Sequence, residues 1–363
     1  MKEKVYADYC KLLNETVIPS TMPSVDRNEA MRPLRNWIQK YTPKKLFKFR
    51  ECTDRNIEAF RNQQIWFATG SLMNDDFDAS LFCNKKWLLD SWQQNIDSDG
   101  ILKQIKFLKQ ERDFPTSIKA KIDANILATS IANMNSIDWA QLNSEIVHVV
   151  GELINLQLPF IDQVEQTTMK ISSFSEDITS PSMWGHYANS STGFALAYDF
   201  RNGYYNEKYL PISTLLPVVY RSDRIDATFH AGYIMQYTIA KLIATYSNFP
   251  NELFDQYVNT FIPCPDIFMQ YKVLFQKSFD WAPEKEWRMT LSCSQLSNSS
   301  SITKKPCALY LGRKISSTYE LILRNIAYKQ KIPVYKMTID DASKNYALKP
   351  IPQKNTKKHL LCL

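Results

Sequence analysis

Segments with the residue pattern of β-strands come in separate groups along this chain of 363 residues, and two long helical stretches lie between the groups. The strand-like segments are short and alternating, whereas the helical stretches repeat apolar residues every three or four positions. The helical stretches cover about residues 81–166 and 225–278. Because a doubly wound fold would alternate strands and helices regularly, the pattern predicts an α+β fold. We expect a mixed, mostly antiparallel sheet with two large helical insertions.

The predicted strands indicate a single core domain over about residues 46–340. We expect residues 1–45 to form a loose lead-in followed by a helix at 28–41, and residues 341–363 to form a basic, exposed tail. The predicted strands are 46–50, 64–68, 169–174, 192–200, 215–220, 286–292, 308–311 and 333–339, and the predicted shorter helices are 56–62, 181–187 and 317–326.

Glycine is scarce, which excludes several common chemistries. Only 8 residues are glycine, where an average chain of this length would have about 25. The two commonest phosphate-binding loops, G-x-G-x-x-G and G-x-x-x-x-G-K-[ST], are both absent from the sequence. The H-E-x-x-H and C-x-x-C patterns are also absent, which argues against a zincin, a zinc ribbon or a thioredoxin-like site.

Charge and cysteine usage predict the environment of the protein. The net charge of +7 permits an anionic partner such as a nucleotide or a nucleic acid without requiring one. The seven cysteines are scattered, and the first residues lack the apolar segment of a secretory signal, so we expect reduced thiols in the cytoplasm. The most apolar stretch, residues 146–161, is interrupted by polar side chains, so we expect no membrane span.

The first group of candidate site residues is a pair of cations on strand 46–50. Lys48 and Arg50 are two positions apart and therefore share one face of the strand. Two such cations can clamp a phosphate or a carboxylate, with arginine binding in a bidentate manner. The alternative is that this is an exposed edge strand, whose charged side chains prevent it from pairing with the strand of another molecule.

The second group is an acidic loop. Asp75, Asp76 and Asp78 follow Asn74 directly or nearly so. Carboxylates this close together can bind a divalent cation, but the spacing of a calcium loop is absent. We therefore favour a cap for the helix that is expected to follow, because Asp and Asn side chains accept hydrogen bonds from free helix N–H groups.

The third group combines hydroxyl and aromatic side chains. Ser173 and Ser175 lie near the end of a predicted strand, and Trp184, His186 and Tyr187 lie on the short helix that follows. Together they predict the floor of a pocket. A Ser–His hydrolase is disfavoured because the G-x-S-x-G elbow is absent, and the alternative for the histidine is a partly buried side chain with its hydrogen bonds satisfied.

The fourth group is a pair of carboxylates beside tryptophans. Glu284 and Glu286 flank Lys285 and point the same way if the segment is extended. Two carboxylates on one face can perform acid–base work on a hydroxyl-bearing substrate. The alternative is a solvated strand end at which Glu286 pairs with a neighbouring cation.

Taken in order, these groups resemble a bacterial family of proteins of unknown function, DUF2971. The family name carries no activity. One departure is Asp76, where the family loop usually has proline; the change removes a rigid turn and keeps the acidic pattern. The motifs that carry the resemblance are LFKFR at 46–50, IWFATGSLMNDDFD at 65–78, SFSE at 173–176, MWGHYANSSTGFALAYD at 183–199, EKEWR at 284–288 and ALYLG at 308–312.

A second resemblance is to mono-ADP-ribosyltransferases of the arginine–serine–glutamate type. Those enzymes have a cation on the first core strand, then a Ser-x-Ser strand, then a Glu-x-Glu near the last catalytic strand. The order of Arg50 (or Lys48), residues 173–175 and residues 284–286 looks like that pattern. The resemblance implies an ADP-ribosyltransferase-like core and NAD as a substrate.

The resemblance also implies roles for single residues on the cofactor side. Arg50 would contact the NAD pyrophosphate or ribose, with Lys48 beside it. Ser173 and Ser175 would shape the nicotinamide side of the pocket.

The remaining implied roles concern the aromatic helix and the two carboxylates. Tyr187 or Trp184 would stack on nicotinamide, with His186 nearby. Glu286 would hold the ribose 2′-hydroxyl and stabilise the oxocarbenium-like charge, and Glu284 would orient or deprotonate the acceptor.

Three functions follow as hypotheses. The first is an NAD-consuming enzyme, either a transferase to a macromolecular acceptor (protein or nucleic acid) or an NAD glycohydrolase, in the role of a toxin or phage-defence effector. The second is a metal-dependent nuclease that uses the acidic loop and Glu286. The third is a non-catalytic sensing module. The helical insertions would then serve as a lid, a surface for a homo-oligomer or partner protein, or a sensor.

Overall fold

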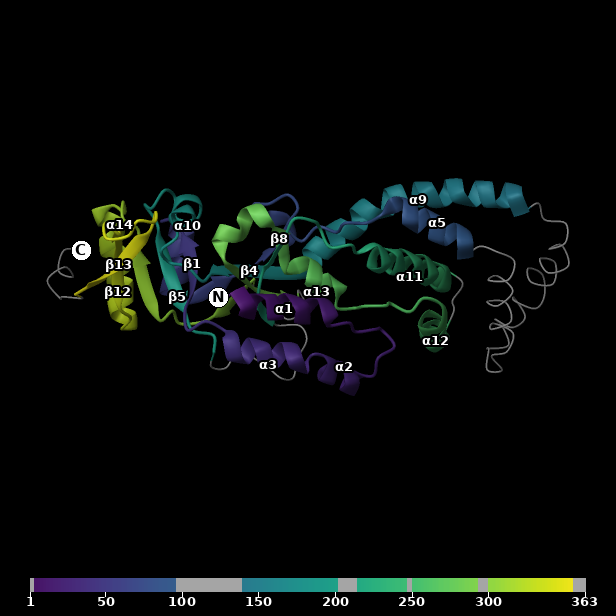
Figure 1. Cartoon of the computed structure of the whole chain (residues 1–363), viewed down its shortest axis with the longest axis horizontal. Helices are drawn as coiled ribbons and strands as arrows, with labels where there is room; N and C mark the ends of the chain where they lie inside the picture. The colour runs from purple at the N-terminus through teal and green to yellow at the C-terminus, as the bar shows by residue number, and fades with distance from the viewer. Residues whose placement is uncertain (1–2, 96–138, 202–213, 247–249, 293–299, 355–363) are drawn as a thin grey trace.

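The computed structural model describes residues 3–95, 139–201, 214–246, 250–292 and 300–354. These residues form an α+β fold, as the sequence predicts. In Figure 1 the strands gather toward one end of the molecule, and the helices α5 (Lys85–Asn95), α9 (Trp139–Thr168) and α11 (Thr228–Tyr246) project from the other end. No described helix is both long enough and apolar enough to cross a membrane.

The main sheet has nine strands within the described residues, in the order β13-β12-β11-β5-β1-β4-β9-β6, with β3 also beside β4. Of these neighbours only β11 and β12 are parallel, so the sheet is mixed and mostly antiparallel. The strands are β1 (Leu46–Arg50), β3 (Ala68–Thr69), β4 (Met169–Ser175), β5 (Phe194–Tyr198), β6 (Thr214–Pro217), β9 (Glu286–Ser292), β11 (Ala308–Leu311), β12 (Val334–Ile339) and β13 (Leu348–Gln353).

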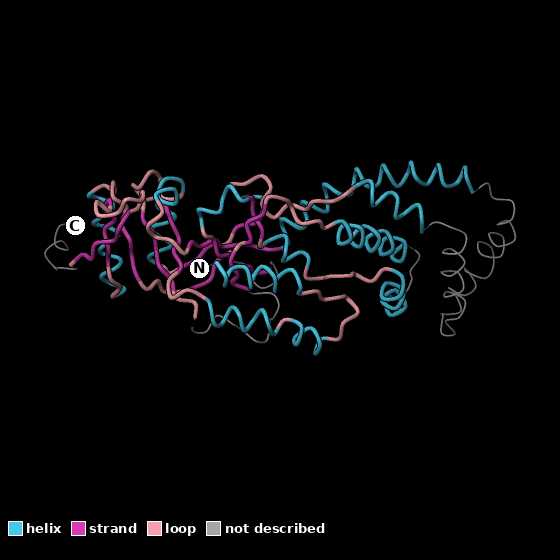
Figure 2. The backbone as a smooth tube through the Cα atoms, in the orientation of Figure 1, coloured by secondary structure: helices cyan, strands magenta, loops and turns pink. Residues whose placement is uncertain are grey.

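The described residues also form two smaller sheets and further helices (Figure 2). One small sheet pairs β10 (Ser301–Thr303) with β2 (Gln64–Trp66), and the other pairs β7 (Val219–Arg221) with β8 (Gln276–Ser278). The helices besides α5, α9 and α11 are α1 (Glu3–Glu15), α2 (Ser24–Ala30), α3 (Arg32–Tyr41), α4 (Asp54–Arg61), α10 (Pro181–His186), α12 (Asn251–Phe261), α13 (Met269–Leu274) and α14 (Ser317–Gln330), with the 3-10 turns η1 (Gly70–Leu72) and η5 (Phe279–Glu284).

The main sheet is almost divided between β1 and β4. β1 pairs with β5 along all its residues, but it pairs with β4 only where Phe47 faces Ser175. Beyond that point the two strands separate; in Figure 1, β5 and β12 run up and down the page whereas β4 runs along it. Lys48 and Arg50 lie on the separated part of β1, so their side chains can enter the space between the two half-sheets.

Both predicted helical insertions contain helices. α5, α9 and α11 pack together around Leu88, Ile154, Ile161 and Met235. The part of the first insertion at residues 96–138 lies outside the described residues. The predicted end of the second insertion is wrong, because helix α13 ends at Leu274 and residues 276–278 form strand β8 beside β7.

The loose lead-in predicted for the first residues is wrong. α1 is a helix that buries Tyr9 and Leu13. The Tyr9 hydroxyl donates to the carbonyl oxygen of Pro217 at 2.8 Å, and its ring lies 4.8 Å from that of Trp37 on α3. The sequence does not indicate this helix because its buried face depends on a tyrosine. The tyrosine ring is apolar, but its hydroxyl needs a hydrogen-bond partner when it is buried.

The exposed tail predicted from residue 341 is also wrong in part. β13 pairs with β12 in antiparallel register, from Val334 facing Gln353 to Ile339 facing Leu348. Pro350 and Pro352 argue against a strand when only the sequence is known. β13 is, however, the last strand of the sheet, and an edge strand tolerates proline. Residues 355–363 lie outside the described residues.

Gly193 fixes the position of Arg50. A Cβ atom at Gly193 would lie 2.1 Å from the carbonyl oxygen of Arg50 and 3.0 Å from that of Ala188. The Gly193 carbonyl also accepts from the N–H of Gly312 at 2.9 Å. The end of β1 therefore packs directly against backbone, with no room for a side chain.

We expect Gly193→Ala to lower the free energy of unfolding by about 2 kcal/mol or more, because backbone must shift to admit the methyl group. Urea denaturation measures the change. Gly185→Ala on α10 is the matched control, because a Cβ atom there meets nothing within 4 Å. Equal stability of the two variants would contradict the close packing.

An ionisable pair joins α9 to α11. His230 is 8% exposed, and its Nε2 lies 3.5 Å from the Oε1 atom of Glu165. Burial alone would lower the pKa of His230, but interactions with Cys264 and Glu165 raise it to about 9. The folded pKa therefore lies above that of an unfolded histidine, about 6.5. The resulting stability is fully present below pH 6.5 or so and is lost as the pH rises through about 9.

We expect the free energy of unfolding to fall by up to about 3 kcal/mol between pH 6.5 and pH 10 through this group. His230→Gln should remove that pH dependence, whereas the exposed His148 on α9 provides a control in His148→Gln. Chemical denaturation at several pH values measures both. A wild-type slope that survives in His230→Gln would rule out this histidine as its source.

Candidate functional site

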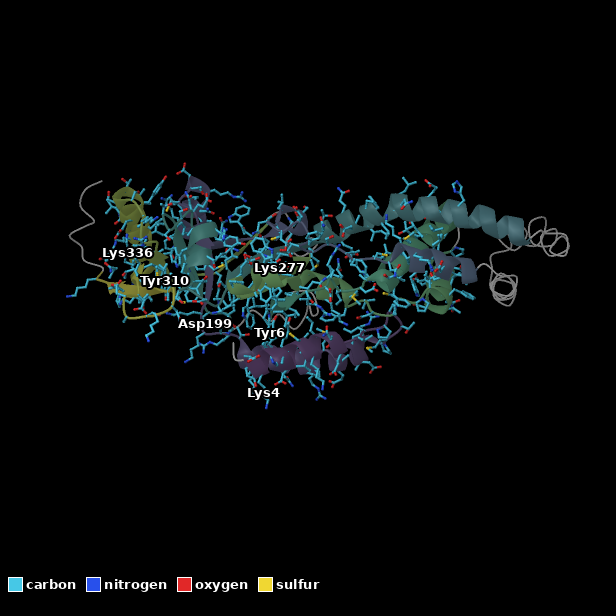
Figure 3. The ribbon with its side chains drawn as sticks, turned by 45° about the horizontal axis from the view of Figure 1, so that its top comes forward. Lys4, Tyr6, Asp199, Lys277, Tyr310 and Lys336 are labelled. Atoms are coloured by element: carbon cyan, nitrogen blue, oxygen red, sulfur yellow. The ribbon has the colours of Figure 1, made fainter. Side chains whose placement is uncertain are left out.

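A cavity of about 510 Å³ opens where β1 and β4 separate. Its volume is within the usual range for small-molecule sites. It contains most of the residues singled out from the sequence, Asp78 among them, and it adds Lys277. Figure 3 places Lys277 near the middle of the molecule, away from Tyr310 on β11 and Lys336 on β12. The polar lining residues are Lys48, Arg50, Thr53, Arg55, Asn56, Asn74, Asp78, Ser173, Ser175, Tyr187, Lys277, Glu284 and Glu286.

One wall of the cavity carries the two cations of β1. The Lys48 ammonium donates to the Ser172 hydroxyl at 2.7 Å and to the Ser173 carbonyl at 3.0 Å. Burial holds the pKa of Lys48 well below its usual range, and the charge of Arg50 acts in the same direction. Arg50 is half-buried, and its guanidinium has no hydrogen bond or ion pair to another described residue. Its donors are available to an anion in the cavity.

The opposite wall is built around the fully buried guanidinium of Arg288 on β9. Its Nε and Nη2 atoms donate to the two carboxylate oxygens of Glu286 at 2.8 and 3.1 Å. Its Nη2 atom donates to Asp78 at 2.7 Å, and its Nη1 atom donates to the carbonyl oxygen of Leu274 at 2.6 Å. The guanidinium therefore satisfies one carboxylate in a bidentate manner and binds a second.

Glu286 is held as an anion. Burial would raise the pKa of this carboxyl, but Arg288, Lys277 and a hydrogen bond with Ser173 outweigh burial and lower it. Its side chain is 5% exposed and lines the cavity. A fixed, ionised carboxylate at this depth can stabilise positive charge that develops on a bound ligand.

Glu284 is held by two donors from other elements. The Lys277 ammonium donates to its Oε2 atom at 2.8 Å, and the Tyr187 hydroxyl donates to its Oε1 atom at 2.5 Å. Asn74 in turn donates to the Tyr187 hydroxyl at 2.8 Å. Burial, followed by the nearby Glu284, raises the pKa of Tyr187, so the phenol stays neutral and acts as a donor.

The backbone at Lys285 brings the two glutamates to the same cavity. Glu284 ends η5 and Glu286 begins β9, so they do not share one extended strand face as the sequence predicts. Lys285 lies between them with φ 45°, a left-handed conformation that is uncommon outside glycine and often marks a functional site. Its ammonium pairs with Asp177 at 2.8 Å, away from the cavity.

Two predicted cofactor contacts do not lie in the cavity. Trp184 is 0% exposed, donates from Nε1 to the Ile178 carbonyl at 2.7 Å and packs edge to face against Phe49. A stacking role for Trp184 is therefore wrong, because no face of the ring is free, and Tyr187 remains the aromatic residue at that position. His186 is exposed and is not among the lining residues.

The helix cap predicted for the acidic loop is also wrong. No helix begins at the loop, because the next one is α5 at Lys85. Asp78 instead points inward to Arg288, and Asp75 accepts from the N–H of Phe77 within its own loop. Within the residues that the structure describes, no group of three or more His, Cys, Asp or Glu side chains could hold a metal ion.

Sequence reasoning missed Arg288 and Lys277. Arg288 is two positions after Glu286 on a predicted strand, so both side chains share one strand face. This spacing could have predicted that the two residues pair. Lys277 fell in a segment predicted as helical, and nothing local connects it to Glu284. The role of Ser175 is structural, since its hydroxyl donates to the Glu284 carbonyl at 2.6 Å and so holds the turn before β9.

Comparison with known proteins gives one match. Residues 183–289 match the family described as "Protein of unknown function (DUF2971)". The chain contains a DUF2971-like domain. The matched segment runs from α10 to β9 and therefore includes Tyr187, Glu284, Glu286 and Arg288. Neither a curated protein nor a solved structure matches this chain.

We expect Arg288→Met to lower the free energy of unfolding by about 3–5 kcal/mol, because it leaves the carboxylates of Asp78 and Glu286 buried without their cation. Thermal or urea denaturation measures the loss. Arg61→Met is the control, since Arg61 pairs with Glu58 at an exposed site and should cost less than about 1 kcal/mol. Similar losses in the two variants would contradict the buried network.

Proposed function

We propose that this protein is an NAD-consuming enzyme of the ADP-ribosyltransferase type, which cleaves the bond between nicotinamide and ribose and passes ADP-ribose to a macromolecular acceptor or to water. The observation that supports it is the composition of the cavity between β1 and β4. The guanidinium of Arg50, which pairs with no described residue, lines one part of the cavity, and the ionised carboxylate of Glu286 lines another.

The two walls suit the two ends of a dinucleotide. Arginine binds phosphate oxygens in a bidentate manner, and Arg50 has its donors free for the pyrophosphate among the described residues. The half-buried ring of Tyr187 lines the opposite side and supplies an aromatic face for nicotinamide. Ser173, whose side chain forms a hydrogen bond with Glu286, lines the same cavity.

The chemistry requires stabilisation of a cation. When the C–N glycosidic bond breaks, its electron pair leaves with neutral nicotinamide, and positive charge develops at C1′ of the ribose. Glu286 would stabilise that charge and accept a hydrogen bond from the ribose 2′-hydroxyl. The acceptor then bonds to C1′ and loses a proton. Glu284 stands beside Glu286 on the same side of the cavity, where an acceptor would approach.

The same proposal covers the cellular role. Consumption of NAD in the cytoplasm would harm a cell, which fits a toxin or an antiviral defence effector. The projecting helices α5, α9 and α11 provide a surface for a macromolecular acceptor, a partner protein or a second copy of the chain (Figure 1).

The donor set gives less support to the metal-dependent nuclease. The carboxylates of Asp78 and Glu286 are both bound to Arg288, and a cation in that place competes with a divalent metal. Asp75 and Asp76, which complete the nuclease hypothesis, are not among the residues that line the cavity.

The test is nicotinamide release from NAD by the purified protein, with and without cell lysate. We expect Glu286→Gln to lower the rate by about a hundredfold or more while NAD still binds, because the variant keeps the shape of the side chain and loses its charge. Dependence on lysate would indicate transfer, and release without lysate would indicate hydrolysis.

Glu320→Gln is the matched control for this test. Glu320 also pairs with two cations, Arg324 and Lys336, but it lies on α14 and does not line the cavity. It should leave nicotinamide release unchanged. The proposal fails if the folded wild-type protein releases no nicotinamide under either condition.

A further inference from the structure

Five buried charges meet at the carboxylate wall of the cavity, and they do not cancel. Asp78, Glu284 and Glu286 are 2%, 7% and 5% exposed, while Lys277 and Arg288 are 6% and 0% exposed. We call these residues the charge cluster. It holds three carboxylates against two cations and so has one net negative charge when all five are ionised.

The contacts show which carboxylate is in excess. Arg288 binds Glu286 through two hydrogen bonds, and Lys277 binds Glu284 at 2.8 Å. These two pairs alone would be neutral. Asp78 is the third carboxylate: its oxygens lie 2.6 and 2.7 Å from the Arg288 guanidinium, and one lies 3.9 Å from the Lys277 ammonium.

The sharing of Arg288 matters for Glu286. A carboxylate whose charge is neutralised by its own arginine has little electrostatic attraction left for a developing cation. When the same arginine also serves Asp78, the group of three keeps a net negative charge. In a buried site of low effective dielectric constant, one charge at this distance has a large effect.

Resting on the proposed function, we propose that Asp78 is a positioning residue for the reaction: by sharing Arg288 with Glu286, it keeps the carboxylate wall net negative where positive charge passes from the nicotinamide ring to the ribose. Asp78 acts through Arg288 and does not need to touch the reacting atoms. The acidic loop, which has no helix to cap, thereby has a role in the site.

The groups facing the cluster support this assignment. The phenols of Tyr187 and Tyr220 adjoin the glutamates, and burial raises the pKa of each, so both are neutral. The Tyr220 hydroxyl accepts from the N–H of Glu286 at 2.7 Å. Lys48 and Arg50 of β1 line the same cavity. The charge of Glu286 acts on Lys48, but burial and Arg50 hold the pKa of Lys48 well below its usual range, and an anionic pyrophosphate would balance Arg50.

The loop offers a matched control. Asp75 is also buried, at 8% exposed, and lies three residues from Asp78. Its carboxylate accepts from the N–H of Phe77 and has no hydrogen bond or ion pair with the cluster among the described residues, and Asp75 does not line the cavity. Its contact with the cluster is through the backbone, where its carbonyl oxygen accepts from the N–H of Asp78 at 2.9 Å, and Asp75→Asn leaves that contact in place. Asp75→Asn and Asp78→Asn make the same chemical change in the same loop, and only the second alters the charge of the cluster.

The first measurement is steady-state nicotinamide release. We expect Asp78→Asn to lower kcat by about tenfold or more and also to raise KM for NAD, because the net negative charge attracts the cationic nicotinamide ring of bound NAD as well as the charge that passes to C1′. Asp75→Asn should keep kcat within about twofold of wild type. A wild-type kcat in folded Asp78→Asn would overturn the inference.

The second measurement needs no turnover. Calorimetric titration compares binding of the 1-methylnicotinamide cation with binding of neutral nicotinamide, which has nearly the same shape. We expect the wild type and Asp75→Asn to prefer the cation and Asp78→Asn to lose that preference. If the wild type releases no nicotinamide, the proposed function fails, and this titration still decides the role of Asp78. A preference that persists in Asp78→Asn, or is missing in the wild type, overturns it.

Discussion

A single buried guanidinium, that of Arg288, holds together parts of the chain that are far apart in sequence. It binds Glu286 on its own strand, the carbonyl oxygen of Leu274 at the end of α13 and Asp78 from a loop 210 residues away. Such a cation is costly to bury unless its donors are satisfied. The positions of α13, the acidic loop and β9 are therefore interdependent, and the carboxylate wall of the cavity exists because all three meet there.

The opposite wall has a different physical origin. The cations of β1 are placed by backbone geometry, since β1 leaves β4 after one residue pair and Gly193 lets the loop before β5 close against Arg50. Lys48 finds partners on β4, but Arg50 does not find one among the described residues. In the carboxylate wall every carboxylate thus binds a cation of the protein, whereas in the β1 wall Arg50 keeps its donors for a ligand.

Local patterns in the sequence were sufficient for most elements and for much of the site. Alternation located β1, β4 and β9, and helical periodicity located α3 and α14. Arg50, Tyr187 and Glu286 could be predicted as site residues from their side-chain chemistry, and all three line one cavity in the structure. The match to DUF2971 covers two of the six motifs that suggested that family, at 183–199 and 284–288.

The failures have a common cause, which is dependence on distant partners. A capping interpretation of Asp78 was reasonable from its neighbours, but the residue that fixes it is Arg288, far along the chain. Trp184 looked available because aromatic residues near a polar helix often are, yet the packing of Phe49 covers it. α1 was missed because the partner of its buried Tyr9 hydroxyl, the Pro217 carbonyl oxygen, is far away in the sequence. β13 was missed because its prolines fit a strand only at the edge of a sheet, and the sequence does not show that β13 lies there.

The narrow junction between the half-sheets has a mechanical meaning. β1 and β4 pair only where Phe47 faces Ser175, which is fewer residue pairs than at any other boundary of the main sheet within the described residues; even β3 and β4 have two. A molecule that contacts Arg50 on one side and Glu286 on the other spans that boundary. Its occupancy would act as a cross-link between two halves of the protein, and the rigidity of the whole sheet would then report whether the cavity is filled.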